Sequence, residues 1–533
     1  MNKEEIIKQI QNCDTALGIE LGSTRIKSVL INKNHEVIAN GAFNWENRLE
    51  DGLWTYHLDD AVRGVRESFG DMAANVKELY GIELESVGCI GISGMMHGYV
   101  PLDKDDNQIS KFLTWRNTNT VEAVGTLTEL FNFNIPLRWS ISQLYQAILN
   151  KEEHVSRLAY FSTLAAYIHY LLTGEKVIGV GEASGMFPID STTNDFDQDM
   201  LDKFDKLIED KGYPWKIRDI IPKVLVAGDD AGRLTEKGAR LLDPTGTFKA
   251  GVKMVPPEGD AGTGMTATNA VGPRTGNVSC GTSIFAMVVL EKQLSKLYKD
   301  IDMVTTPSGM PVAMVHCNNG TSVLDGWVGL FREFTKASGL NISDGQIFEA
   351  LYKESLKGSD NCDDVMVVNY LSGEPVTGLT EEGRPMVVYK ADSKFNLANF
   401  MKSQIYSIFG ALTIGMRILE NENVVVERLT GHGGMFKTEG VAQRFMSAAM
   451  KAPVTCLKSA GEGGPYGMAL LAMYAINREP GEKLEDYLDN KVFAGLESTT
   501  IDATDEEKKG YLDYLAQYEK ILETEKSAVE NLR

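Results

Sequence analysis

Two turns in this chain combine a glycine with two hydroxyl residues, and both lie beside apolar runs. Gly22-Ser23-Thr24 separates residues 16–21 from 26–31, and Gly281-Thr282-Ser283 is followed by residues 284–290. A glycine turn lets the backbone come close to a ligand and directs N–H and O–H donors towards it. That chemistry suits a phosphate group. An ordinary hairpin turn has the same composition, because glycine and serine are common there.

An aspartate in a glycine-rich loop is the second candidate for chemistry. Glu258-Gly259-Asp260-Ala261-Gly262 follows a strand predicted at 252–255 and leads into a helix predicted to run through residue 270. An isolated aspartate at a helix start most often serves as an N-cap. The two similar turns, about 260 residues apart, indicate two domains of one architecture that face each other. A carboxylate between such turns would be placed for catalysis, which favours the functional interpretation of Asp260.

A histidine follows the strand predicted at 87–93, in Ser93-Gly94-Met95-Met96-His97-Gly98. Ligands bind outside the carboxyl ends of strands in open α/β sheets, so Met96 and His97 are predicted to touch a substrate. The alternative is a core histidine with packing methionines. Trp115-Arg116-Asn117 adds a ring that can stack on a sugar and two donors for hydroxyls, although by itself this segment is weak support.

A further glycine-rich loop, Gly431-His432-Gly433-Gly434 with Lys437 just after it, lies between a strand predicted at 424–430 and a helix from about residue 438. Such a loop lets a flat or phosphorylated ligand approach the backbone. The sequence is neither GxGxxG nor a Walker A motif, so neither standard nucleotide signature applies.

The elements that must position these residues follow from hydrophobic periodicity. A short helix at 1–13 precedes the hairpin, and residues 37–43 add a third strand to an antiparallel meander. A helix at 59–80 then leads to the strand at 87–93, which we expect to run parallel to the first strand in a mixed α/β sheet. Further helices are predicted at 140–173, at 395–419, from Glu462-Gly463 through residue 476, and at 503–532, the last as a charged surface or packing element.

Composition narrows the function classes. The chain has 533 residues, which favours two or more domains. A formal net charge of −21 argues against nucleic acid as a partner. The six cysteines include no CxxC pair, which argues against a zinc site and a disulfide framework and fits reduced thiols. No apolar run is long enough to span a membrane and no signal peptide is evident, so we expect a cytoplasmic location.

Taken in order along residues 15–495, these stretches resemble the FGGY carbohydrate kinases, within the sugar kinase, actin and Hsp70 ATPase group. The resemblance implies an α/β fold with two ribonuclease H-like domains of actin/Hsp70 ATPase type, whose mixed sheets are flanked by helices. It places an N-terminal domain at 14–268, a C-terminal domain at 269–500 and a charged helix at 501–533. It also implies ATP and Mg²⁺ as cofactors and a small-molecule sugar held in a cleft between the domains, with a homodimer as a further expectation.

Residue roles carry over from that resemblance. Asp260 would be the general base and would also contact the sugar. Glu20, where the family usually has aspartate, would hold Mg²⁺, directly or through water. The sugar site would be lined by Met96, His97, Trp115 and Arg116. The phosphates and adenosine would be held by Gly22, Ser23, Thr24, Lys27, Gly281, Thr282, Ser283, Gly433, Gly434 and Lys437. This chain departs from the family at Met95, where glutamine is usual, and at His432, Met435 and Phe436, where small residues are usual.

The function expected from this resemblance is ATP-dependent phosphorylation of a ketopentose such as xylulose, or of a related sugar or polyol. The chemistry agrees, because phosphoryl transfer needs positioning and charge stabilisation more than covalent help. A sugar-responsive regulatory protein, weakened in catalysis by Glu20, is the alternative. An Hsp70-like ATPase is disfavoured by the motif at Met96-His97, and a dehydrogenase by the lack of GxGxxG after the first strand.

Overall fold

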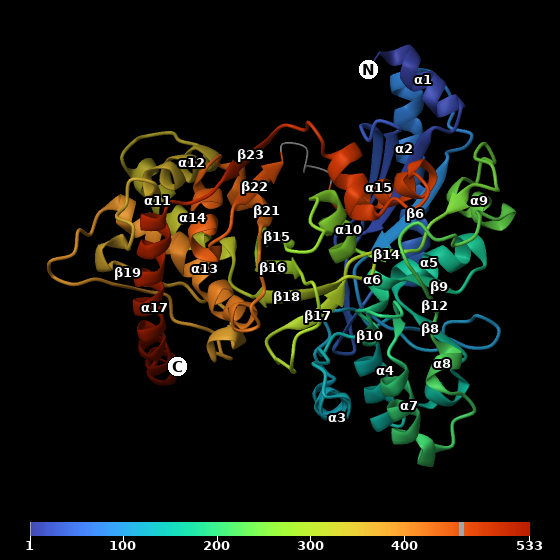
Figure 1. Cartoon of the computed structure of the whole chain (residues 1–533), viewed down its shortest axis with the longest axis horizontal. Helices are drawn as coiled ribbons and strands as arrows, with labels where there is room; N and C mark the ends of the chain where they lie inside the picture. Colours follow the sequence, from blue (N-terminus) through green and yellow to red (C-terminus); the bar gives the residue numbers. More distant parts are fainter. Residues whose placement is uncertain (1, 458–462, 533) are drawn as a thin grey trace.

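Two mixed sheets form the cores of two lobes in the computed structural model, which describes residues 2–457 and 463–532 (Figure 1). The first sheet has the order β13-β6-β1-β2-β3, with β14 also paired to β6. Its strands are β1 (Thr15–Leu21), β2 (Arg25–Asn32), β3 (Val37–Asn44), β6 (Cys89–Gly94), β13 (Lys253–Met254) and β14 (Glu258–Gly259). The strands β1, β2 and β3 form an antiparallel meander, and β6 runs parallel to β1.

The second sheet repeats this arrangement. Its order is β17-β18-β16-β15-β21-β22-β23, in which β15, β16 and β18 form the meander and β21 runs parallel to β15. The strands are β15 (Thr275–Cys280), β16 (Ile284–Val289), β17 (Asp302–Thr305), β18 (Pro311–Cys317), β21 (Arg428–His432), β22 (Val454–Leu457) and β23 (Ser498–Ile501). The predicted fold class, two domains of one architecture with mixed sheets, is confirmed.

Helices cover both sheets. They are α1 (Lys3–Gln11), α2 (Leu58–Tyr80), α3 (Val121–Phe131), α4 (Ser140–Leu149), α5 (Leu164–Thr173), α6 (Val180–Ala183), α7 (Gln198–Leu207), α8 (Ile217–Ile220), α9 (Glu236–Leu242), α10 (Asp260–Ala267), α11 (Asp325–Ala337), α12 (Asp344–Ser355), α13 (Leu397–Asn421), α14 (Val441–Met450), α15 (Gly464–Asn477), α16 (Leu484–Tyr487) and α17 (Asp505–Asn531). The short strands are β4 (Arg48–Glu50), β5 (Leu53–Thr55), β7 (Val100–Leu102), β8 (Tyr160–Ser162), β9 (Val177–Gly179), β10 (Ile189–Asp190), β11 (Asp195–Phe196), β12 (Lys223–Leu225), β19 (Met366–Val368) and β20 (Met386–Val388).

Helix α15 joins the two lobes, because it lies between β22 and β23 of the second sheet in sequence but packs on the first sheet (Figure 1). The backbones come so close that a Cβ at Gly18 of β1 would lie 2.1 Å from the carbonyl oxygen of Pro465. Only glycine allows that approach. The same helix packs along α10, which begins at Asp260. The two helices therefore set how the lobes stand around the candidate catalytic residue.

Helix α17 is a packing element of the second lobe despite its charged sequence. It begins with a capping box at Thr504 and Glu507. One face buries Tyr511, Tyr514 and Tyr518, which recur at helical spacing. Their hydroxyls bond to Thr413, Ser403 and Tyr370 respectively. The buried tyrosines therefore anchor the end of the chain to the second core.

Two predicted elements are wrong in extent. The helix expected at 140–173 is interrupted, because α4 ends at Leu149, Lys151 adopts a left-handed φ of +57°, and β8 pairs with β7 before α5 begins. Continuous apolar character hid a buried strand there, since buried helices and strands look alike without a clear period. The strand expected at 424–430 begins only at Arg428. Glu462, expected to open the last apolar helix, lies outside the described residues.

Over residues 2–457 and 463–532, no helix is both long enough and apolar enough to cross a membrane.

Candidate active site

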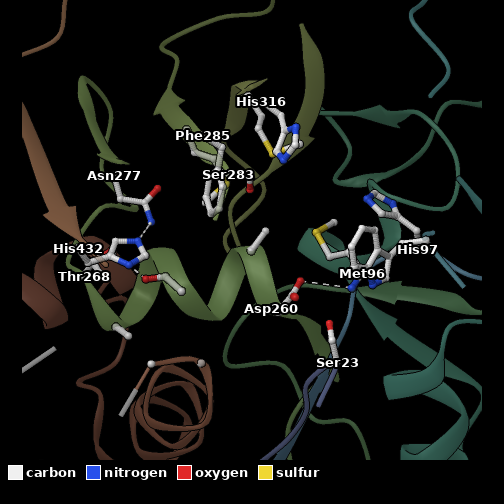
Figure 2. Close-up of a pocket in the computed structure, with 18 of the residues that line it drawn as sticks. Ser23, Met96, His97, Asp260, Thr268, Asn277, Ser283, Phe285, His316 and His432 are labelled. Carbon is white, nitrogen blue, oxygen red and sulfur yellow. Dashed lines mark hydrogen bonds between the residues drawn. The ribbon is translucent and has the colours of Figure 1, made fainter. Parts of the chain in front are cut away.

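A cavity of about 410 Å³ lies between the two lobes and contains the predicted catalytic aspartate. Its walls come from strands of the second sheet, from turns and loops of the first lobe, from α10 and from the start of α15. Figure 2 shows α10 crossing the cavity, with Asp260 at one end and Thr268 at the other. The lining residues are Ser23, Met96, His97, Trp115, Arg138, Asp260, Ala261, Gly264, Ala267, Thr268, Asn277, Ser283, Phe285, Met287, Met314, His316, His432, Gly463, Gly464 and Tyr466.

Asp260 is the first residue of α10, immediately after the N-cap Gly259. Its Oδ1 accepts a hydrogen bond of 3.3 Å from the backbone N–H of Met96, at the end of β6 (Figure 2). The carboxyl group is open to the cavity, yet it lies deep between the lobes, and this burial raises its pKa above the usual aspartate value. The N–H groups of Met96 and Ala261 oppose the shift. An anchored carboxylate of raised basicity is suited to accept a proton.

Two further acids lie behind Asp260. Glu258 and Glu182 are 1% and 0% exposed, and burial raises the pKa of each, to about 8 for Glu258. Glu258 accepts a 2.9 Å hydrogen bond from the N–H of Glu182 in α6. Burial therefore favours the uncharged form of both acids.

His97 has no free ring nitrogen to offer a ligand. Its Nδ1 lies 3.0 Å from the carbonyl oxygen of Gly185, and its Nε2 lies 3.1 Å from Nε of Arg138. A carbonyl can only accept and a guanidinium can only donate, so the ring is neutral with its proton on Nδ1. Burial, and then the charge of Arg138, lower the pKa of His97 to about 3. His97 lines the cavity, and its backbone adopts a left-handed φ of +68°.

Trp115 lines the cavity and is 40% exposed, which leaves its ring available for stacking. Arg116 lies outside the cavity wall. Its guanidinium stands 4.1 Å from the ring centre of Trp54 and 5.9 Å from that of Trp115. The arrangement brings Met96, His97 and Trp115 together but not Arg116, so a sugar contact by Arg116 stays a prediction.

A second cavity of about 620 Å³ adjoins the first and shares His432, Gly463 and Gly464 with it. Among the residues predicted to bind nucleotide, Lys27, Gly433, Gly434 and Lys437 line it, together with the predicted metal ligand Glu20. Gly433 has a φ of +101°, and a Cβ there would lie 2.5 Å from the carbonyl oxygen of Cys280. The remaining lining residues are Gly431, Phe436, Glu439, Gln443, Cys456, Leu457 and Thr499.

Glu20 is one of two acidic residues that line the second cavity, the other being Glu439. It pairs with Lys27 across the β1–β2 hairpin and with Ser93 of β6. Burial, and then the charge of Asp260, raise the pKa of Glu20 to about 7, while Lys27 opposes the shift. A Cβ at Gly464 would lie 1.9 Å from Oε1 of Glu20, so this glycine gives the carboxylate its space. The two carboxylates thus repel each other across the junction of the cavities.

The two glycine-hydroxyl turns lie at the ends of corresponding hairpins. Ser23 of the first and Ser283 of the second line the cavity that holds Asp260 (Figure 2). The other predicted members, Gly22, Thr24, Gly281 and Thr282, belong to the same turns but are outside both cavity walls. One hydroxyl from each lobe therefore faces the same space.

Several lining residues were missed by sequence reasoning. Phe285 and Met287 of β16, and Met314 and His316 of β18, point to the cavity by alternation along their strands. That period-two pattern is visible in the sequence, but which face meets the cleft is not. Arg138 precedes α4 within a run that carries no recognised motif.

Comparison with known proteins gives one family. The model for the FGGY family of carbohydrate kinases, N-terminal domain, matches residues 15–248, and that for the C-terminal domain matches residues 276–476. Together they span most of the chain. A xylulose kinase from Haemophilus influenzae is 22% identical over 400 residues, which cover 72% of this chain and 75% of that protein.

Solved structures show the same fold. A xyloylose kinase from Brucella ovis superposes with a TM-score of 0.77 at 16% identity, covering 97% of this chain and 100% of that one. A gluconate kinase from Lactobacillus acidophilus superposes with a TM-score of 0.76 at 16% identity, covering 96% and 98%. These neighbours are named for different acceptors, so the fold leaves the acceptor open.

Proposed function

Because this chain belongs to the FGGY family of carbohydrate kinases, we propose that it transfers the γ-phosphoryl group of ATP to a hydroxyl of a ketopentose such as xylulose, or of a related sugar or polyol. The observation that carries this proposal is the place of Asp260. It lies in the interlobe cavity between one hydroxyl of each glycine turn. Relatives named xylulose kinases support the acceptor class.

Asp260 would act as the general base. Its carboxylate would take the proton of the sugar hydroxyl while the hydroxyl oxygen attacks the γ-phosphorus and ADP leaves. Its raised pKa makes it a stronger base than an ordinary aspartate. The bond from Met96 N–H to Oδ1 fixes the carboxylate relative to the proposed acceptor wall of Met96, His97 and Trp115.

The nucleotide would occupy the second cavity. Gly433 and Gly434 would allow the adenosine to approach the backbone, and Lys27 and Lys437 would face its phosphates. The turns Gly22-Ser23-Thr24 and Gly281-Thr282-Ser283 would hold the β- and γ-phosphates from opposite lobes. The junction of the two cavities at Gly463 and Gly464 supports this path, because it connects the proposed nucleotide space to Asp260.

The residues present also fit Mg²⁺. Magnesium in kinases is bound by one or two carboxylates together with substrate phosphates. The charge of Asp260 contributes to the raised pKa of Glu20, and a bound cation would favour the charged form of Glu20. No group of three or more His, Cys, Asp or Glu side chains in the described part of the chain is arranged as a protein-only metal site. When bound, the ion would neutralise charge on the phosphates, with Glu20 as its ligand directly or through water.

The decisive experiment is a coupled ADP-release assay with a panel of ketoses, aldonic acids and polyols. We expect turnover with at least one ketose, and Asp260→Asn should lower kcat by at least about 1,000-fold while ATP binding persists in calorimetry. Asp195→Asn, on β11 in the first lobe, is a matched control that should keep activity. Unchanged turnover in Asp260→Asn would refute the base assignment.

Glu20 favours one alternative, a sugar-responsive regulatory protein with weakened catalysis. That function would give sugar and ATP binding in calorimetry but no turnover with any acceptor of the panel.

We further propose domain limits at 14–268, 269–500 and 501–533, a cytoplasmic location and a homodimer. Limited proteolysis and sedimentation velocity test the limits and the dimer.

A further inference from the structure

A line of contacts runs from the first lobe to the second through the proposed acceptor wall. It begins at the carbonyl of Gly185, which accepts from Nδ1 of His97 at 3.0 Å. Arg138 donates from Nε to Nε2 of His97 at 3.1 Å. The same guanidinium forms an ion pair through Nη2 with Asp302, the first residue of β17. Three side chains thus join the β6 loop, the segment before α4 and the second sheet.

Asp302 is itself held in place. Asn134 donates from Nδ2 to Oδ1 of Asp302 at 3.1 Å and to the carbonyl of Ile301 at 3.0 Å. Further along β17, the backbone N–H of Thr305 donates to Oγ of Ser184 at 3.0 Å, and its hydroxyl donates to the carbonyl oxygen of Val180 at 3.0 Å. β17 is therefore docked on the first lobe along its length.

The ion pair is partly sheltered, since the side chains of Arg138 and Asp302 are 28% and 16% exposed. Arg138 also lines the cavity, whereas Asp302 does not. Charge-assisted hydrogen bonds in such surroundings are about twice as strong as neutral ones. Asp302 can therefore fix the guanidinium, and the guanidinium in turn can fix the imidazole.

We propose that Arg138 and Asp302 form an interlobe latch that holds His97 in one neutral tautomer, so that the second lobe takes part in building the acceptor site of the first. Arg138 and Asp302 are positioning residues that act through His97. The latch explains why His97 does not take up a second proton and has no free N–H to donate to a ligand. The part of this proposal that concerns the acceptor site rests on the proposed function, whereas the tautomer of His97 does not.

The charged and titratable groups around His97 agree with a neutral ring. Arg138 lies directly on Nε2 and disfavours a second positive charge. His316, on β18, has its pKa lowered by burial and by Arg138, so it also stays neutral. Asp302 faces Arg138 rather than the imidazole, and Asp260 bonds to Met96 N–H on the neighbouring residue. Removing the guanidinium would leave His97 near these two carboxylates.

The first test needs no substrate. The chain contains seven histidines, so ¹⁵N-histidine labelling gives few resonances, and loss of one in His97→Asn identifies it. We expect a protonated Nδ1, an unprotonated Nε2 and no titration from about pH 5.5 to about pH 8. Because burial is the larger cause of the low pKa and Arg138 the smaller, Arg138→Met should raise the pKa of His97 from about 3 but leave it below the unperturbed value of about 6.5. Asp302→Asn keeps an oxygen that can accept from Arg138 but removes the negative charge. It should therefore change the pKa of His97 by less than Arg138→Met does.

The matched control is Arg218→Met. Arg218 pairs with Asp195 within the first lobe, in an ion pair more exposed than that of Arg138 and Asp302. It should leave the His97 resonance unchanged. Titration of His97 near pH 6.5 in the parent protein would overturn the proposal, as would an unchanged resonance in both Arg138→Met and Asp302→Asn. Because these measurements use ligand-free protein, they stand whether or not a sugar is found.

The second test uses D-xylulose, or whichever panel sugar is turned over. In Arg138→Met and Asp302→Asn we expect KM for the sugar to rise about tenfold or more and to exceed any change in kcat or in KM for ATP. The sugar KM of Arg138→Met should also become dependent on pH, as His97 gains a proton. Equal losses in kcat and both KM values would indicate only a structural role and would overturn the proposal.

Discussion

The two glycine-hydroxyl turns have the same place in two similar sheets but are held in different ways. Behind the first, the Trp45 indole donates to Gly22 O at 2.7 Å, the Tyr56 hydroxyl to Ser23 O at 2.6 Å, and Trp45 N–H to Thr24 O at 3.1 Å. Each carbonyl there accepts from one aromatic residue. The first turn thus depends on two aromatic residues that directly follow β3 and β5.

The second turn is held by a small, polar segment. Thr321 donates to Gly281 O from its N–H at 2.7 Å and its hydroxyl at 2.8 Å. Thr282 O accepts from Gly320 N–H and from the Ser322 hydroxyl, both at 3.0 Å. Each of these two carbonyls has two donors, so the second turn is the more redundantly fixed.

The strand pair beside each turn differs in charge. In the first hairpin Glu20 faces Lys27, and at the corresponding pair of the second hairpin Ser279 faces Phe285. Beside the turns, the first hairpin therefore carries a charged pair, while the second carries a hydroxyl and an aromatic ring. The repeated strand order gives both turns the same place at the ends of their hairpins. The side chains beside the two turns nevertheless differ in charge.

The sharpest test of that difference removes the charge. Glu20→Gln should lower kcat/KM by about 100-fold or more, because charge stabilisation at the phosphates is lost. Ser279→Ala, at the corresponding position, should change it by less than about threefold. Glu20→Asp, the residue usual in the family, should stay within about tenfold of the parent. Steady-state kinetics of the three variants measures these changes in kcat/KM. Equal losses in Glu20→Gln and Ser279→Ala would show that the two hairpins do not differ in this way.

The glycines that open the two turns should also differ. A Cβ at Gly281 meets nothing within 4 Å, whereas a Cβ at Gly22 would lie 3.0 Å from Arg25 O. Gly281→Ala should therefore keep its melting temperature and raise KM for ATP about tenfold if phosphate approaches the turn. Gly22→Ala should lose stability as well. An unchanged KM for ATP in a folded Gly281→Ala would remove that turn from the phosphate site.

Stability should depend on pH through the first hairpin. The pKa of Glu20 is raised to about 7 in the folded chain from an ordinary value of 4.5, so the folded state binds more protons between those values. The free energy of unfolding should thus fall as pH rises from about 4.5 to about 7, by about 1–2 kcal/mol after screening is discounted. Urea titrations of Glu20→Gln should lack this component, and identical pH profiles for both proteins would contradict it.

The smallest effects test how the turns are fixed. Tyr56→Phe removes the donor to Ser23 O and should cost about 1 kcal/mol of unfolding free energy. Ser322→Ala leaves Gly320 N–H on Thr282 O and should cost less than about 0.5 kcal/mol. Denaturant unfolding measures both. A larger loss of unfolding free energy in Ser322→Ala than in Tyr56→Phe would show that the second turn is not the more redundantly fixed one.

Much of the fold could be predicted from local pattern. The hairpins, α2 and α13 show clear periods, and the repeat of the glycine-hydroxyl turn predicted two domains of one architecture. The errors at 140–173 and 424–430 arose where apolar runs carry no period. Asp260, Met96 and His97 were found because glycines mark the loops that carry them.

The sequence by itself determined which residues could bind phosphate and accept a proton, because those residues are contiguous and their chemistry is local. Only the tertiary structure decided that Arg138 and Asp302 meet at His97, that Arg116 stacks on Trp54, and that Phe285 and His316 line the cavity. These contacts join segments far apart in the chain, and their partners are set by how the two sheets pack around α10 and α15. No spacing along one strand or helix encodes that packing.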